Sequence, residues 1–320
     1  MKPLVILTGP TAVGKTDLSI RLAKKINGAI ISADSMQVYR YMDIGSAKIM
    51  PKEMQGIPHY LIDRLEPSEE FNVVRFKQMA ESALSEIYQN GKIPIVTGGT
   101  GFYIQALLYD IDFNKEEEDS SFRQEMTDYA KLHGAHALHE KLRDIDPVSY
   151  ETIHENNVKR VIRALEYYHL NKTPISLHNQ EQHEKQSPYN FAYFVLTDDR
   201  QRLYQRIDKR VDLMMERGLL EEVKSLHAMG YHRDMVSMQG LGYKEILDYL
   251  EGNCSLEEAV YIIKRETRHF AKRQLTWFRR ERDVIWLDKN KYDEDAILQQ
   301  MIETLTGKGI TNESEIERKI

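Results

Sequence analysis

Residues 4–16 read LVILTGPTAVGKT, and this stretch decides the fold. Leu4–Leu7 is a short apolar run followed by a turn, which is the pattern of a buried strand. Residues 9–16 match G-x-x-x-x-G-K-[ST] in full, and Asp17–Ile26 has helical spacing of its apolar side chains. A strand, a glycine-rich turn and a helix in this order form a loop whose backbone N–H groups converge on phosphate oxygens. The alternative, a chance match in an ordinary loop, is disfavoured by the strand before it and the helix after it.

This loop predicts a site for a diphosphate-like anion and does not identify the group attached to that anion. The helix N-terminus adds partial positive charge, Lys15 adds a full charge and Thr16 offers a hydroxyl to Mg²⁺. The expected diphosphate ligands are Gly9, Pro10, Thr11, Ala12, Val13, Gly14, Lys15 and Thr16.

Outward from the loop, strands and helices alternate. Further strand-like runs lie at 29–32, 93–96, 191–196 and 284–287. Helical spacing covers 71–88, 122–170 and 259–277, and the polar stretch 173–189 reads as a loop. Alternation of this kind indicates βαβ units and a parallel sheet. We therefore predict an α/β fold with a P-loop NTPase-like parallel-sheet core over 1–114 and 191–306. An all-helical insertion occupies 115–190, and a loose tail spans 307–320.

Composition limits the setting in which the protein works. The chain has 320 residues and a single cysteine, Cys254, so an intramolecular disulfide and a cysteine-rich zinc site are both excluded. No apolar run has the length of a signal-peptide core or a membrane span, and the mean hydropathy is −0.55. We expect a cytoplasmic protein without a membrane partner.

Charge is unevenly distributed along the chain. Residues 264–282, KRETRHFAKRQLTWFRRER, hold eight Lys and Arg against two Glu, a local charge of +6 in a chain whose formal net charge is −6. Phe270, Trp277 and Phe278 interleave with these charges, and aromatic planes among cations suit stacked bases and phosphates. This basic run is therefore either a surface that contacts nucleic acid or a solvated helix face.

Two further groups are expected at the carboxyl ends of strands, where ligands bind in open α/β sheets. Asp34 follows the run 29–32 and is a metal ligand, a general base or a capping residue. The run 93–96 ends in TGGTG without the carboxylate that ATPases and GTPases normally place there to help hold Mg²⁺. Thr100 in this turn can donate one hydrogen bond, and the alternative is a plain tight turn.

A pair of arginines forms the third group. Arg206 and Arg210 are four residues apart on an expected helix, so they share a face and can clamp an anion. The alternative is salt bridging to Asp208 or Asp212. Three histidines at positions 133, 136 and 139 superficially suggest metal ligation, but no other ligand shares a recognisable spacing with them.

The set as a whole resembles the tRNA dimethylallyltransferase (tRNA isopentenyltransferase) family, bacterial branch. The matching blocks are GPTAVGKT (9–16), ADSMQVYRYMDIGSAK (33–48), VTGGTGFYIQAL (96–107), the Arg206–Arg210 helix running into GLLEEV (218–223), and GLGYKE (240–245) with AKRQLTWFR (271–279). Region 113–150 is less similar. Eukaryotic members carry a zinc finger, for which this chain lacks the cysteines.

The resemblance implies transfer of the dimethylallyl group from dimethylallyl diphosphate to N6 of the adenosine directly 3′ of the anticodon, tRNA position 37. The implied catalytic residues are Asp34 as general base, Thr100, Lys15 and Arg210. Arg210 also joins the diphosphate ligands, and Mg²⁺ at Thr16 is the implied cofactor. The implied contacts with the anticodon stem-loop and the flipped base are Ser35, Met36, Gln37, Val38, Thr100, Arg123, Lys159, Arg160, Arg163, Gly242, Tyr243, Lys244, Lys272, Arg273, Gln274, Trp277 and Arg279.

The motifs alone, without the family resemblance, are also compatible with other functions. A P-loop kinase of a nucleoside or small molecule would hold ATP in the loop and use Asp34 to activate a hydroxyl. A tRNA-binding GTPase-like module would need guanine-reading segments, which are not evident. Prenyl transfer to free AMP is a third possibility, although the helical insertion and basic run favour tRNA. We expect the protein to be a monomer.

Overall fold

The computed structural model describes residues 1–113 and 119–312 of the chain. Contacts divide the chain into two units, each described here by itself. The first, called the core unit, combines Met1–Leu108 with Pro188–Ile320, and the second, called the inserted unit, is Tyr109–Ser187.

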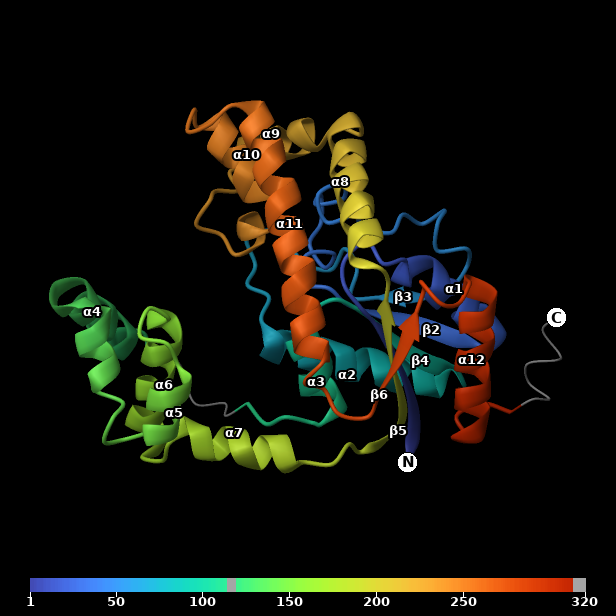
Figure 1. Ribbon diagram of the computed structural model, residues 1–320, viewed down its shortest axis with the longest axis horizontal. Helices are drawn as coiled ribbons and strands as arrows, with labels where there is room; N and C mark the ends of the chain where they lie inside the picture. The colour runs from blue at the N-terminus through green and yellow to red at the C-terminus, as the bar shows by residue number, and fades with distance from the viewer. Residues whose placement is uncertain (114–118, 313–320) are drawn as a thin grey trace. The chain divides into compact units, whose positions relative to one another are not determined.

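The strands of the core unit form one parallel sheet (Figure 1). They are β1 (Lys2–Thr8), β2 (Gly28–Ala33), β3 (His59–Tyr60), β4 (Ile93–Gly98), β5 (Tyr189–Thr197) and β6 (Val284–Asp288). Their order across the sheet is β3-β2-β4-β1-β5-β6. The apolar run in β1 is buried throughout, as expected for a strand that is covered on both faces. The predicted α/β class with a parallel sheet is confirmed.

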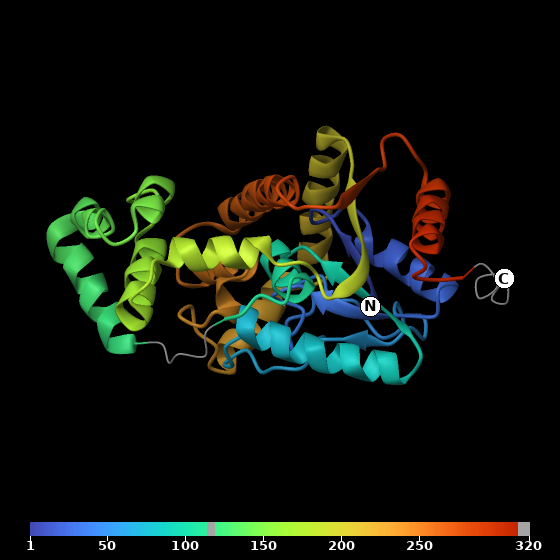
Figure 2. The ribbon, with the colours of Figure 1, turned by 90° about the horizontal axis from the view of Figure 1, so that it is seen from below.

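Helices cover both faces of this sheet (Figure 2). α1 (Lys15–Lys25) and α12 (Glu294–Gly307) share one hydrophobic cluster with the strands. α2 (Val73–Gln89) and α3 (Gly101–Leu108) pack together, with α2 also against β2 and β4. The chain leaves β1 through α1 and comes back to β4 through α2, so right-handed crossovers place α1 and α2 on opposite faces.

The core unit also contains a group of helices that follow β5 in the chain. They are α8 (Arg200–Glu216), α9 (Leu219–Ala228), the short 3₁₀ helix η1 (Ser237–Gln239), α10 (Tyr243–Leu250) and α11 (Leu256–Phe278). Ion pairs of 2.5 Å join α8 to α11, from Asp208 to Arg268 and from Asp212 to Lys264.

The inserted unit contains α4 (Ser120–Glu140), α5 (Pro147–Thr152), α6 (Val158–Asn171) and α7 (Ile175–Glu184). Its core includes Met126, Leu138 and Val161. The prediction of a loop over 173–189 is wrong, because α7 occupies most of that stretch. Its sequence ISLHNQEQHE has no apolar stripe, which is the signal that identifies an amphipathic helix.

Other differences from the sequence expectations are smaller. β3 is too short to leave a pattern, and β5 begins two residues before the expected strand. The expected loose tail is wrong for its first residues, since Ile310 and Thr311 are buried, and 313–320 lie outside the described residues. Within 1–113 and 119–312, no helix has the length and apolar character that crossing a membrane requires.

Candidate active site

The loop between β1 and α1 has the backbone shape that its glycines predict. Gly14 adopts a left-handed φ of 98° at the start of α1, a conformation that a side chain would strain. A Cβ at Gly9 would lie 2.5 Å from the Leu196 carbonyl oxygen of β5, so only glycine fits there. No side chain caps α1, and its first N–H groups are therefore available to an anion.

Lys15 folds back over this loop. Its Nζ donates to the carbonyl oxygens of Gly9, at 3.0 Å, and Pro10, at 2.8 Å. Burial lowers the pKa of the Lys15 ammonium to about 7, the charge of Arg210 lowers it as well, and the Asp34 carboxylate opposes both effects. A bound diphosphate would supply the missing negative charge.

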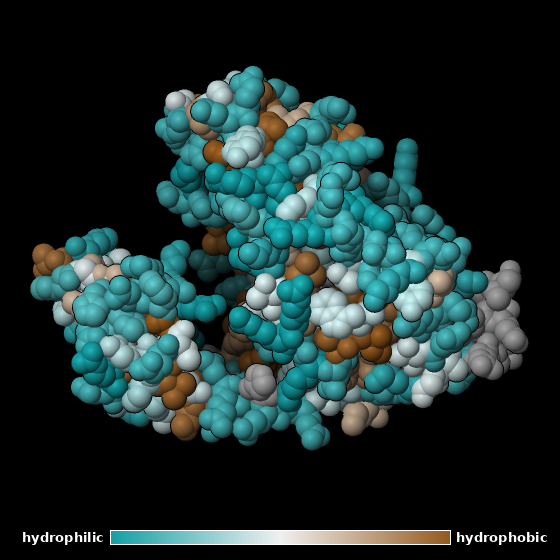
Figure 3. All heavy atoms as spheres, in the orientation of Figure 1, coloured by the Kyte–Doolittle hydropathy of each residue, from teal (hydrophilic) through white to brown (hydrophobic). Residues whose placement is uncertain are grey.

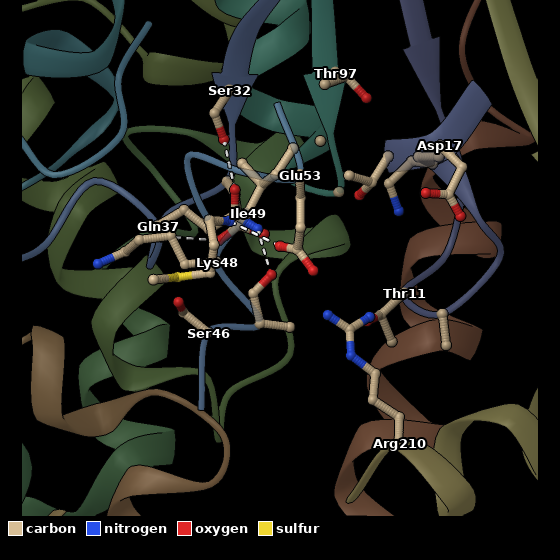
Figure 4. Close-up of a pocket in the computed structure, with 18 of the residues that line it drawn as sticks. Thr11, Asp17, Ser32, Gln37, Ser46, Lys48, Ile49, Glu53, Thr97 and Arg210 are labelled. Atoms are coloured by element: carbon tan, nitrogen blue, oxygen red, sulfur yellow. Dashed lines mark hydrogen bonds between the residues drawn. The ribbon is translucent and has the colours of Figure 1, made fainter. Parts of the chain in front are cut away.

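A cavity of about 910 Å³ lies over the loop, and Asp34 is part of its wall. Figure 4 shows Gln37, Ser46 and Lys48 on one side of the opening, with Thr11 and Arg210 on the other. Asp34 follows β2 as expected, and its Oδ1 accepts the N–H of Met36 at 2.8 Å. The carboxylate therefore both shapes its own turn and faces the cavity.

Arg206 and Arg210 of α8 both line this cavity. The alternative that they pair with Asp208 and Asp212 is wrong, because those carboxylates bind Arg268 and Lys264 of α11. Arg206 lies 4.0 Å from Asp198. Arg210 is half-buried, whereas Arg206 is exposed. Burial lowers the pKa of Arg210, the Asp34 carboxylate raises it and the charge of Arg206 lowers it.

The turn after β4 is built of small residues because neighbouring segments approach its backbone closely. A Cβ at Gly98 would lie 2.3 Å from the Ala33 carbonyl oxygen, and a Cβ at Gly101 would lie 2.2 Å from the Trp277 ring. Thr100 donates its N–H to the Ala33 carbonyl oxygen at 3.2 Å, but it does not line the cavity. Thr97, the first residue of TGGTG, does line the cavity, although the sequence predicted a role only for Thr100.

Comparison with known proteins identifies the family. A family model described as IPP transferase matches residues 37–281. The chain belongs to the IPP transferase family. It is 63% identical to the tRNA dimethylallyltransferase of Lachnoclostridium phytofermentans, covering 97% of this chain and 99% of that one.

Two solved structures agree with this membership. The tRNA isopentenylpyrophosphate transferase of Bacillus halodurans has a TM-score of 0.74 and 44% identity, covering 100% of this chain and 98% of that one. A eukaryotic dimethylallyltransferase acting on tRNA has a TM-score of 0.80 and 31% identity, covering 97% of this chain and 80% of that one. This IPP transferase is therefore an enzyme of the prenyltransferase type with a P-loop-like fold, and the kinase alternative loses its support.

The core unit of this IPP transferase presents several of the predicted tRNA contacts on its surface. Figure 3 shows a predominantly hydrophilic face along α8 and α11. Lys272, Arg273 and Arg279 are exposed on α11 or at its end, whereas Trp277 is half-buried and meets Phe102 edge to face. Also half-buried are Ser35, Met36, Gln37 and Lys244.

Four other predicted tRNA contacts have little or no exposed surface. Val38 and Tyr243 have no exposed surface, and Gly242 is buried at the start of α10. Gln274 is 5% exposed. Its Oε1 accepts the Thr11 N–H at 2.9 Å, and its Nε2 donates to a carbonyl oxygen of the β4 turn at 3.0 Å. Gln274 therefore lines the cavity and joins the phosphate loop to the turn after β4.

The inserted unit presents the remaining predicted contacts. Lys159 and Arg160 are exposed on α6. Arg123 and Arg163 instead bind the buried carboxylate of Glu166, at 2.7 Å and 2.8 Å, while their side chains stay partly exposed. The two arginines therefore have a structural partner of their own.

The three regularly spaced histidines of the inserted unit have other partners. His136 Nδ1 lies 2.8 Å from Glu155, His139 Nε2 lies 2.8 Å from the Ile153 carbonyl oxygen, and the His133 ring lies on Tyr129. Within 1–113 and 119–312, no group of three or more His, Cys, Asp and Glu side chains is placed to hold a metal.

The cavity does offer oxygens that suit Mg²⁺. Thr16 is exposed and lines the cavity, as do the carboxylates of Asp17 and Asp34. The Thr97 hydroxyl oxygen is buried and has no hydrogen-bond partner in the structure. Magnesium in phosphate sites binds few protein groups and fills its other positions with water and phosphate oxygens, so the residues present fit this ion.

Proposed function

We propose that this enzyme transfers the dimethylallyl group of dimethylallyl diphosphate to N6 of the adenosine 3′-adjacent to the anticodon, tRNA position 37. The observation that carries the proposal is a single cavity shared by the phosphate loop, Arg210 and Asp34. The loop and Arg210 form a site for a diphosphate, and Asp34 is a proton acceptor beside it. Thr97 stands at the end of β4, where a nucleotide hydrolase would place a carboxylate.

The reaction follows from these positions. The N6 nitrogen of adenine attacks the first carbon of the dimethylallyl group, the C–N bond forms and the C–O bond to diphosphate breaks. The proton leaves N6 for Asp34, and the electron pair of the broken bond leaves with diphosphate. Positioned general bases contribute about 10²–10⁴-fold to rate. Lys15, the loop N–H groups and Arg210 stabilise the charge that grows on the leaving diphosphate.

Thr16 would hold Mg²⁺, which supplies further neutralisation of the diphosphate charge. A cavity of about 910 Å³ has room for a five-carbon chain and a flipped base together. The base must leave the anticodon-loop stack to enter it, at a cost of a few kcal/mol. Exposed cations on α11 and α6 supply phosphate contacts for the tRNA.

The test is a transfer assay with unmodified tRNA, dimethylallyl diphosphate and Mg²⁺, followed by digestion and mass spectrometry of the nucleosides. Parallel reactions replace tRNA with free AMP, or dimethylallyl diphosphate with ATP. The expected product is an adenosine in tRNA heavier by one C₅H₈ unit, without any need for ATP. Transfer to AMP alone, or ATP turnover without transfer, would contradict the proposal.

A further inference from the structure

One wall of the cavity is a loop whose shape is held by side chains of other segments, and one of these side chains, Glu222, also lines the cavity. Residues 34–48, here called the wall loop, run from Asp34 to Lys48 and contribute Gln37, Ser46 and Ala47 to the lining between them. Tyr41 and Ala47 in this loop have positive φ, at 64° and 47°. Such conformations persist only where surrounding contacts enforce them.

The end of the wall loop is fixed by a buried cation. The Lys48 side chain is 1% exposed, and its Nζ donates to the Tyr39 carbonyl oxygen at 2.7 Å. It also binds the carboxylates of Asp43 and Asp63, at 2.6 Å and 2.5 Å. The loop thus closes on itself around one ammonium group.

The middle of the wall loop is fixed by a carboxylate from α9. Glu222 accepts three consecutive backbone N–H groups, from Asp43 at 3.0 Å, Ile44 at 2.7 Å and Gly45 at 3.1 Å. Three N–H groups converging on one carboxylate make a charge-assisted contact, roughly twice as strong as a neutral one. No other side chain bonds to these three N–H groups in the part of the chain that the structure describes.

Tyr243 of α10 completes this contact. Its hydroxyl donates to Glu222 at 2.8 Å and accepts the Ser46 N–H at 3.2 Å. Its ring lies so close to Gly45 that a Cβ there would come within 2.6 Å of ring carbons. A Cβ at Gly240 would likewise come within 2.5 Å of Met36, the residue whose N–H binds Asp34. The GLGYKE block therefore supports the wall loop at both the Met36 and the Gly45 end.

We propose that Glu222 and Tyr243 are positioning residues, which hold the wall loop so that Asp34 and the base-facing wall keep their reactive arrangement. This inference rests on the proposed function, because it assigns the two residues to the part of the site that binds and deprotonates the acceptor adenine. The phosphate loop, which binds the diphosphate, is held by other contacts. These run from Lys15 to Gly9 and Pro10 and between Gln274 and Thr11. Loss of the Glu222 contact should therefore slow transfer without weakening the diphosphate site.

The experiment compares Glu222→Gln and Tyr243→Phe with the same substitutions at an exposed glutamate and an exposed tyrosine as matched controls. Glu221→Gln changes the adjacent residue, whose side chain is 71% exposed and pairs with Lys224. Tyr261→Phe changes a tyrosine that is 61% exposed. Each variant is measured for kcat with tRNA, for Kd with inorganic diphosphate, and for amide hydrogen exchange of residues 43–46.

Glu222→Gln should lower kcat by about 10- to 100-fold, the range that an ångström-scale misplacement of a reacting group produces. Its Kd for diphosphate should stay within about twofold of the wild type, and amides 43–46 should exchange faster. Tyr243→Phe removes only the hydroxyl and keeps the ring on Gly45, so it tests the same contact if Glu222→Gln fails to fold. Both controls should match the wild type.

Unchanged kcat in both variants would overturn the inference, as would a loss of diphosphate affinity as large as the loss of kcat. The exchange measurement separates this inference from the proposed function. If the wild type transfers nothing to tRNA but amides 43–46 lose protection in both variants, the function fails while the support of the wall loop stands. Unchanged protection in an active enzyme would refute the support itself.

Discussion

Replacing Gln274 with leucine removes one buried side chain that joins the phosphate loop to the turn after β4. The variant loses two hydrogen bonds, to Thr11 at 2.9 Å and to Gly99 at 3.0 Å. Each bond contributes about 1 kcal/mol net, and each buried group left without a partner costs about 1–3 kcal/mol. With two groups left unpaired, the free energy of unfolding should fall by roughly 2–6 kcal/mol, and each kcal/mol lowers Tm by about 2–4 °C in a domain of 150–250 residues. The loop is also less ordered, so the Kd for diphosphate should rise.

The assay is thermal unfolding together with titration of inorganic diphosphate, and Arg273→Ala is the matched control. Arg273 is the adjacent residue on α11 and is exposed. Its loss should leave Tm and diphosphate affinity nearly unchanged, while weakening tRNA binding with a shallower dependence on salt. A Gln274→Leu protein with wild-type Tm and diphosphate affinity, but weaker tRNA binding, would falsify the bracing role and restore the expectation of an RNA contact.

Asp34→Asn should abolish most turnover while sparing diphosphate affinity, and a variant that keeps wild-type kcat would exclude the general-base role. Thr97→Val should weaken diphosphate binding in the presence of Mg²⁺, and Thr97→Ser should restore it; equal affinities in all three proteins would remove this hydroxyl from the site. Burial raises the pKa of Glu281 to about 7 from an ordinary 4.5, against the opposing effects of Trp277 and Arg282. The folded state then binds more protons than the unfolded chain between these values, so stability is lost as pH rises through that window. Glu281→Gln should therefore exceed the wild type in stability at pH 8 and match it at pH 4 in denaturant titrations, and a difference independent of pH would contradict this.

Local patterns were enough to predict the centre of the site. The phosphate loop, the strand before it and the helix after it are consecutive in the chain, so their geometry follows from adjacent residues. Asp34 was also placed correctly, because the carboxyl ends of parallel strands share one edge of the sheet. The α/β class followed from the same alternation of strands and helices.

Local sequence patterns could not predict contacts between residues that are far apart in the chain. Gln274 and Thr11 are far apart in the chain, and nothing near either residue marks them as partners. A basic, aromatic-rich run invites an RNA interpretation for all its members, although one face of α11 must be buried. The burial of Tyr243 against Gly45 was not predicted either, since a block shared with a family indicates that its residues matter and not which way their side chains point. Thr97 was recognised as the start of TGGTG but given no role, because a lone strand-end threonine has no signature.

The central position of β1 in the sheet has a consequence for how the chain reaches its native state. β1 pairs with β4 on one side and with β5 on the other, and Lys2 of the first strand lies opposite Tyr189. During synthesis the ribosome makes the entire inserted unit before β5 emerges, so the sheet cannot be completed until then. Non-local pairing of this kind slows folding through the entropy of loop closure. The inserted unit has a core of its own and can collapse first, which shortens the effective loop that separates the two strands.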